Sequence, residues 1–105
     1  MKKEDFDKIV ACRFNICKDT LLMKGKEYTD EDRLENFKHG GKSLGEIPER
    51  YLMNLVQKHW IAIISNIKRL ESGNSVPVEY WTEKIIDIIN YMILLEGLLI
   101  ERGEL

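Results

Sequence analysis

Residues Trp81–Leu95, with the sequence WTEKIIDIINYMILL, decide the fold class of this chain. Within this stretch Glu83, Asp87 and Asn90 recur at spacings of four and three residues, and most positions between them are isoleucine. On an α-helix these three side chains point within about 60° of one another. The stretch is therefore predicted to form an apolar helix with one polar stripe. Polar groups in such a setting must be paired, bound to a metal or exposed to solvent.

Two further segments have a helical pattern. Apolar residues recur every three or four positions in residues 4–24 and 48–70, and the helix that contains Asp87 extends over residues 77–102. Pro48 and Pro77 suit helix starts, whereas glycine follows the first and third segments. No segment alternates with a period of two for long. We expect one all-α domain, residues 1–105, forming an antiparallel bundle of three long helices plus a short helical segment.

The apolar stripes predict which helix faces are buried. The first helix is expected to bury Phe6, Val10, Phe14, Cys17 and Leu21. The second is expected to bury Leu52, Val56, Trp60, Ile63 and Ile67. Residues 91–100 are apolar nearly all round, which favours burial against a second subunit. We therefore expect a homo-oligomer, either a dimer or a tetramer.

The composition excludes several function classes. The chain has 16 basic and 18 acidic residues and a net charge of −2, which argues against general nucleic-acid binding because that needs a basic field. Residues 85–100 are interrupted by polar side chains and are short for a membrane span. The first three residues are followed by acidic residues instead of an apolar run, so no signal peptide is expected. We expect a cytoplasmic protein, with Cys12 and Cys17 as buried thiols.

The carboxylates suggest a metal site. Glu83 and Asp87 lie one helical turn apart and can hold one hard cation, Mg²⁺ or Mn²⁺. The polar connection of residues 25–47 supplies Glu27, Asp32 and Glu35, which would complete the site. A connection this long in a small domain is more often functional than idle. The alternatives are that Glu83 and Asp87 form the solvated face of the helix and that the connection is an acidic surface loop.

Other polar residues are candidates for catalysis or for substrate binding. His59 is a candidate base, with Lys58 beside it, although a lone histidine there is more often a hydrogen-bonded residue at the core edge. Basic residues that border a core can receive a phosphate, although their stems commonly just cover apolar surface. The substrate-binding candidates are Arg13, Lys24, Tyr28, Arg33, Asn66 and Asn90.

The absence of several well-known motifs narrows the range of possible functions. The sequence has no P-loop, no GxGxxG, no HExxH, no CxxC and no GxSxG, and it offers no obvious Ser–His or Cys–His pair for nucleophilic catalysis. Two possibilities remain: a pocket for metal and phosphate where helices meet, or no active site.

The third helix, EKIIDIINYMILL, resembles the metal-binding helix of the all-α nucleoside triphosphate pyrophosphohydrolases, the MazG-like group. KGKEY, DRLENF and QKHW are similar to elements of small phage proteins related to that group. The resemblance implies Mg²⁺-dependent release of pyrophosphate from a nucleotide, assembly as dimers or tetramers, and Glu83 and Asp87 as metal ligands. The chain lacks the paired-Glu ExxE motif of the preceding helix and has Gln57, Lys58 and His59 instead. Glu27, Asp32 or Glu35 would have to substitute for it.

Three hypotheses follow. The first is a metal-dependent pyrophosphohydrolase-like protein that acts on canonical or modified nucleotides. The second is a non-catalytic phage helical protein that sequesters a nucleotide or docks on a host protein. The third is a purely structural oligomeric bundle. The enzyme hypothesis requires Glu83 and Asp87 to converge with an acidic residue of the connection.

Overall fold

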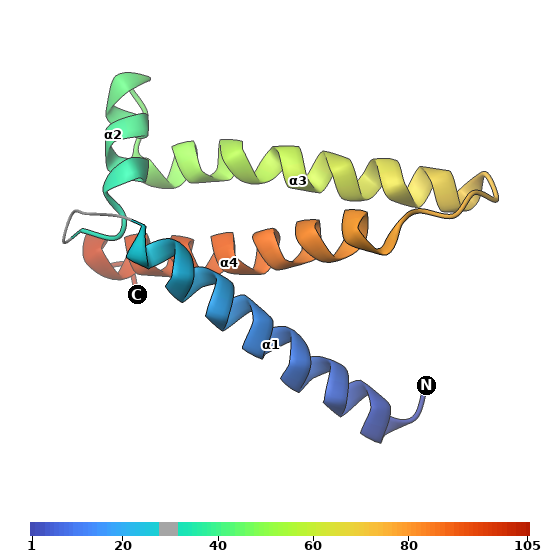
Figure 1. The fold of residues 1–105 in the computed structure, drawn as a ribbon. Coiled ribbons are helices and arrows are strands. Elements are labelled where there is room, and N and C mark those ends of the chain that lie inside the picture. The colour runs from blue at the N-terminus through green and yellow to red at the C-terminus, as the bar shows by residue number, and fades with distance from the viewer. Residues whose placement is uncertain (28–31) are drawn as a thin grey trace.

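The computed structural model describes residues 1–27 and 32–105. Within these ranges the secondary structure is four α-helices, and no strand is present (Figure 1). The helices are α1 (Lys3–Lys26), α2 (Glu35–Ser43), α3 (Pro48–Glu71) and α4 (Val78–Arg102). The predicted all-α class is confirmed. The long helices lie within two residues of the predicted bounds, and α2 is the short helix expected in the connection.

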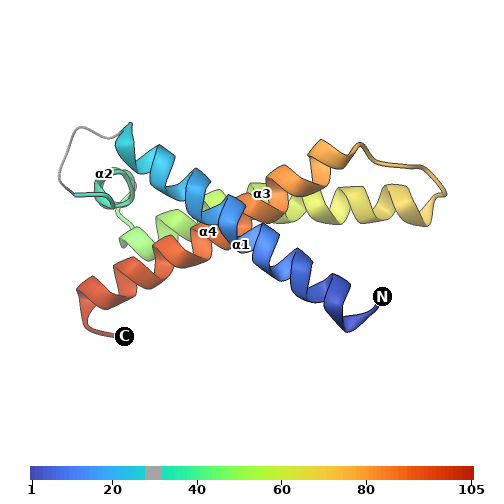
Figure 2. The ribbon, with the colours of Figure 1, turned by 60° about the horizontal axis from the view of Figure 1, so that its bottom comes forward.

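The helices are arranged around a hairpin. α3 and α4 run antiparallel and side by side, and α2 packs against the start of α3 (Figure 1). α1 crosses α4 obliquely, and its first half extends away from the other helices (Figure 2). Among the described elements, α1 packs on α4 alone. The hairpin contacts are consistent with a bundle, but α1 is held along only part of its length.

Local sequence explains how the helices begin and end. Pro48 occupies the first turn of α3, where its missing N–H costs nothing, whereas Pro77 is the residue just before α4. Gly103 ends α4 in the left-handed conformation, with φ of 90°, which glycine adopts without strain. Gly25 was expected to end the first helix, but α1 continues past it to Lys26.

The core lies where α2, α3 and α4 meet. Its buried members are Phe37, Leu52, Val56 and Leu98. Two glycines let α2 approach α3. A Cβ on Gly40 would overlap the Tyr51 ring, and one on Gly41 would lie 2.7 Å from the carbonyl oxygen of Glu46. The glycine pair therefore allows Phe37 to reach the core.

Three ion pairs link the ends of the helices. Arg102, at the end of α4, makes a two-pronged pair with Glu49 in the first turn of α3, and its Nη2 donates to Glu49 Oε1 at 3.0 Å. Lys38 Nζ on α2 lies 2.6 Å from Asp32 Oδ2 and 2.8 Å from Glu101 Oε2. These pairs fix α2 and the start of α3 against the last turns of α4.

Several predicted core residues are exposed, because a stripe is buried only where another helix covers it. In α1, Phe6, Val10 and Phe14 are 56%, 39% and 61% exposed, and only Cys17 of that stripe is fully buried. In α3, Leu52 and Val56 are buried as predicted, whereas Trp60 and Ile67 are exposed. The expectation of two buried thiols is wrong for Cys12, which is exposed. None of the described helices is long and apolar enough to cross a membrane.

Candidate functional site

A small polar cavity lies where the last turns of α1, the start of α2 and the middle of α4 meet. Its volume is about 100 Å³. We call it the Asp87 cavity. The residues that line it are Leu21, Lys24, Arg33, Asn36, Phe37, Asp87, Asn90, Tyr91 and Leu94. It joins candidate residues from the first helix, the connection and the last helix, which are Lys24, Arg33, Asp87 and Asn90.

Asp87 is the central charged group of this cavity. Its side chain is only 17% exposed, so the carboxylate does not belong to a solvated helix face. Lys24 Nζ from α1 lies 3.9 Å from Asp87 Oδ1, and His59 Nδ1 from α3 lies 3.4 Å from Asp87 Oδ2. A half-buried carboxylate thus lies between basic groups of two other helices, as burial of a charge requires.

Two buried polar atoms beside Asp87 lack hydrogen-bond partners among the described residues. They are Asn90 Oδ1 and His59 Nδ1. Asn90 is 6% exposed and lines the cavity, and the His59 ring lies 5.4 Å from the Tyr91 ring. An unsatisfied buried acceptor costs about 1–3 kcal/mol. A bound water molecule, an ion or a ligand can remove this cost.

Gly25 controls the position of Arg33. A Cβ on Gly25 would lie 3.1 Å from Arg33 Nε, closer than nearly all real contacts of this kind. The arginine therefore lies across the last turn of α1 and reaches the same cavity as Lys24. Lys24 and Arg33 therefore line the cavity together with Asp87. Basic side chains at the edge of a core can receive an anionic group.

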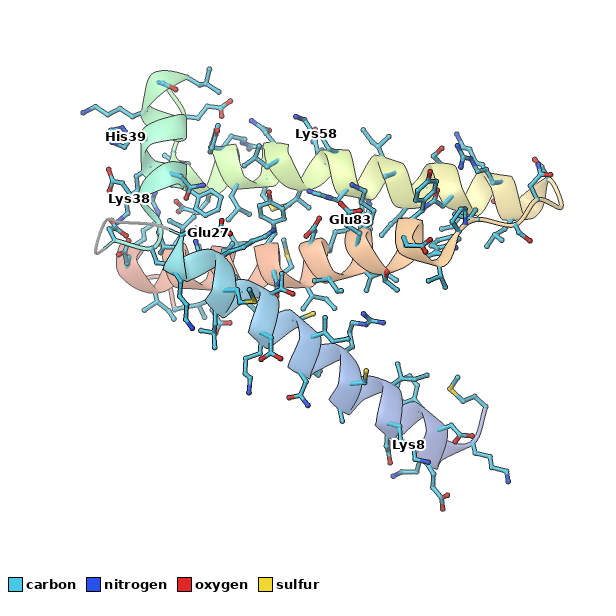
Figure 3. The ribbon with its side chains drawn as sticks, viewed as in Figure 1. Lys8, Glu27, Lys38, His39, Lys58 and Glu83 are labelled. Atoms are coloured by element: carbon cyan, nitrogen blue, oxygen red, sulfur yellow. The ribbon has the colours of Figure 1, made fainter. Side chains whose placement is uncertain are left out.

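The predicted metal ligands of the connection, Glu27, Asp32 and Glu35, do not line the Asp87 cavity. Asp32 accepts hydrogen bonds from Lys38 Nζ at 2.6 Å and from the backbone N–H of Leu34 at 3.0 Å, and the Lys38 bond lowers the pKa of Asp32. Glu35 Oε1 lies 3.1 Å from His39 Nε2. Glu27 is exposed at the end of α1 (Figure 3). Within residues 1–27 and 32–105, no three His, Cys, Asp or Glu side chains gather as a metal site.

Glu83 lies in a different depression from Asp87. Its side chain is 67% exposed and faces a groove of about 360 Å³ between the end of α3 and the start of α4 (Figure 3). We call this the second groove; it is lined by Ala62, Ser65, Asn66, Arg69, Tyr80, Glu83 and Lys84. Asn66 Nδ2 donates to the carbonyl oxygen of Tyr80 at 3.1 Å, which links the two helices. The polar stripe of α4 therefore contributes Asp87 and Asn90 to one depression and Glu83 to another.

Among the described residues, the candidates Lys58 and Arg13 do not line the Asp87 cavity. Lys58 is exposed on α3, and Arg13 is half-buried on α1. Tyr28 lies outside the described residues. The sequence interpretation missed Asn36 and Tyr91 as lining residues. Tyr91 directly follows Asn90, but it lies 100° away on the helix and was expected to be buried against another subunit.

The chain matches no family model, no curated protein and no solved structure. The resemblance of α4 to the pyrophosphohydrolases therefore rests on the sequence pattern, and the function must be argued from the geometry of the site.

Proposed function

We propose that this chain binds a nucleotide together with Mg²⁺, with the phosphates in the Asp87 cavity. The observation that carries the proposal is the unpartnered Oδ1 of Asn90, which is buried in a cavity that also contains Asp87, Lys24 and Arg33. An oxygen acceptor beside a carboxylate calls for a cation or a hydrogen-bond donor, whereas the ammonium group of Lys24, which is 57% exposed, can also bind an anion. A magnesium–phosphate group meets both needs.

The donor set fits Mg²⁺. This ion takes oxygen ligands and usually binds through one or two carboxylates, with phosphates and water as the other ligands. Asp87 and Asn90 would hold it, and they lie three residues apart on one face of α4. Mn²⁺ fits the same oxygen donors. Bound there, the metal would neutralise phosphate charge and favour ionisation of a water molecule.

In this proposal the nucleoside part of the ligand would bind in the second groove. The Asp87 cavity, at about 100 Å³, is too small for a whole nucleotide, since ligand pockets usually measure about 300–1,000 Å³. The second groove measures about 360 Å³ and begins one helical turn away, at Glu83. Tyr80, which is 52% exposed, offers a ring for stacking, and Ser65 offers a hydroxyl for hydrogen bonding.

Calorimetric titration of the chain with adenosine triphosphate and MgCl₂ tests this proposal. Lys24→Met removes a cavity cation and should weaken binding at least about tenfold, which is about 1.4 kcal/mol. Lys26→Met is the matched control, because Lys26 lies on the same helix, is exposed and does not line the cavity. It should change the affinity less than about twofold. Absence of binding, or equal affinity of the wild type and Lys24→Met, would contradict the proposal.

Hydrolysis to pyrophosphate and monophosphate is a second candidate function. It is favoured by His59, whose Nδ1 lies 3.4 Å from Asp87 Oδ2, because an imidazole beside a carboxylate can accept a proton from water. Pyrophosphate release from canonical and modified triphosphates should be lost in His59→Gln, whereas binding should persist. Binding without any turnover in the wild type would instead favour a helical protein that sequesters the nucleotide.

A further inference from the structure

The first half of α1 presents an apolar stripe whose side chains are largely exposed in the part of the chain that the structure describes. Its members are Phe6, Ile9, Val10 and Phe14, which are 56%, 46%, 39% and 61% exposed. We call this set the α1 stripe. Lys8 marks this half of the helix in Figure 3, where it projects away from the hairpin. Aromatic and branched side chains at helical spacing form a buried face in most helices.

The α1 stripe continues into the second half of α1, where its side chains are covered. Cys17 there is 1% exposed, and Leu21 lines the Asp87 cavity. The apolar pattern is thus continuous, but the cover provided by this chain stops halfway along the helix. The exposed half needs a covering surface from another molecule.

The solvent-accessible area of the chain indicates how much surface a second molecule could cover. A compact 12.3 kDa monomer exposes about 6,100 Å² by the usual scaling with mass, whereas this chain exposes 7883 Å². Its radius of gyration is 16.2 Å, against about 13 Å for a compact domain of this length. The excess surface, about 1,800 Å², is more than twice the roughly 800 Å² that each partner contributes to a standard interface.

An apolar groove on the same chain is available to receive the stripe. It has a volume of about 700 Å³ and lies between the end of α1 and the second half of α4. Its walls include Leu21, Leu22, Leu34, Ile93, Leu94 and Gly97. We call it the α1–α4 groove. Leu34 of the same chain lies over Gly97, where an added Cβ would be 3.4 Å from Leu34 Cδ1.

We propose that the α1 stripe of one copy packs into the α1–α4 groove of a second copy, and that the second copy does the same in return. A single chain carries both the projecting stripe and the groove, so a two-fold axis pairs each with its counterpart and closes the assembly. This arrangement makes Leu22 of the groove, which is 60% exposed, a contact residue. The α1 stripe does not line the Asp87 cavity, whereas the α1–α4 groove shares Leu21, Arg33 and Leu94 with it.

Sedimentation of the full chain at 100 µM tests the assembly. The wild type should sediment at twice the single-chain mass, while Phe14→Glu and Leu22→Glu should sediment at the mass of one chain. Ile61→Glu on α3, where the side chain is 66% exposed, is the matched control and should remain a dimer. A wild type with the mass of one chain, or equal dissociation of all three variants, would overturn the proposal. Circular dichroism checks that each variant keeps its helical content.

A distance measurement supports the same test without changing the interface. Cys12 is exposed and points away from the α1 stripe, whereas Cys17 is buried, so a spin label attaches at Cys12 alone. Dipolar coupling between labels should appear in the wild type and should be lost in Phe14→Glu. Absence of coupling in the wild type would refute the pairing of two copies.

Discussion

Replacing Asn90 by leucine should stabilise the chain and abolish nucleotide binding at the same time. Asn90 is 6% exposed, and its Oδ1 has no partner among the described residues. Removing a buried unsatisfied acceptor recovers about 1–3 kcal/mol, and leucine has nearly the same shape. Its neighbours in the cavity include Leu21, Phe37 and Leu94, so the new side chain gains apolar contacts. We expect a net gain of about 1–2 kcal/mol.

Asn66 provides a matched control. It is also an asparagine, it is also 6% exposed, and it lies on the facing helix, but its Nδ2 donates to the carbonyl oxygen of Tyr80. Asn66→Leu removes this hydrogen bond and should therefore lower the free energy of unfolding by about 1 kcal/mol. The two substitutions are the same chemically and should have opposite signs.

Thermal unfolding followed by circular dichroism measures both effects. A change of 1 kcal/mol shifts Tm by about 4–8 °C in a domain of this size, so Asn90→Leu should melt higher and Asn66→Leu lower than the wild type. All three proteins must be compared at one concentration, because self-association raises Tm by mass action. If Asn90→Leu lost 1 kcal/mol or more, the amide would be structural, and the argument for a ligand at Asn90 would fail.

Three further predictions concern the fold. Leu52→Ala should cost about 3 kcal/mol in urea unfolding, because Leu52 is 0% exposed and leaves a cavity in the core. The Arg102 hydrogen bond lowers the pKa of Glu49, so the stability from this pair is present above the unfolded pKa of about 4.3 and is lost as pH falls through the lower folded value. The difference between wild type and Glu49→Gln in urea should therefore shrink below pH 4. A thiol reagent should modify Cys12 quickly and Cys17 slowly, because burial raises the pKa of Cys17.

The helical fold followed from the sequence because the signals for helices are local. Apolar spacing, Pro48 and Gly103 each act within a few residues, so the long helices were predicted within two residues of their bounds. Whether a helix face is buried depends instead on which distant segments pack against it. The α1 stripe has the spacing of a buried face, and only the three-dimensional path of α1 shows that its first half projects beyond α4.

The site was predictable only in part, because the spacing of residues along one helix is a local signal and contacts between segments are not. Asp87 and Asn90 share a helix face by spacing alone, and both line the cavity. Glu83 lies on the same stripe, but it is one turn nearer the connection between α3 and α4 and is exposed. The pairing of Asp32 with Lys38 depends on how the connection folds onto α2, which no periodicity encodes. The approach of Arg33 to Gly25 is likewise a tertiary contact.

The most direct test of the nucleotide proposal is to observe the side-chain amide of Asn90 by nitrogen-15 NMR during a titration with adenosine triphosphate and MgCl₂. The Asn90→Leu spectrum identifies its signals, because they disappear. We expect them to shift progressively to saturation, while those of Asn54, which donates to Glu46 outside the cavity, stay in place. Asn90 signals that do not move at saturating nucleotide would contradict the account.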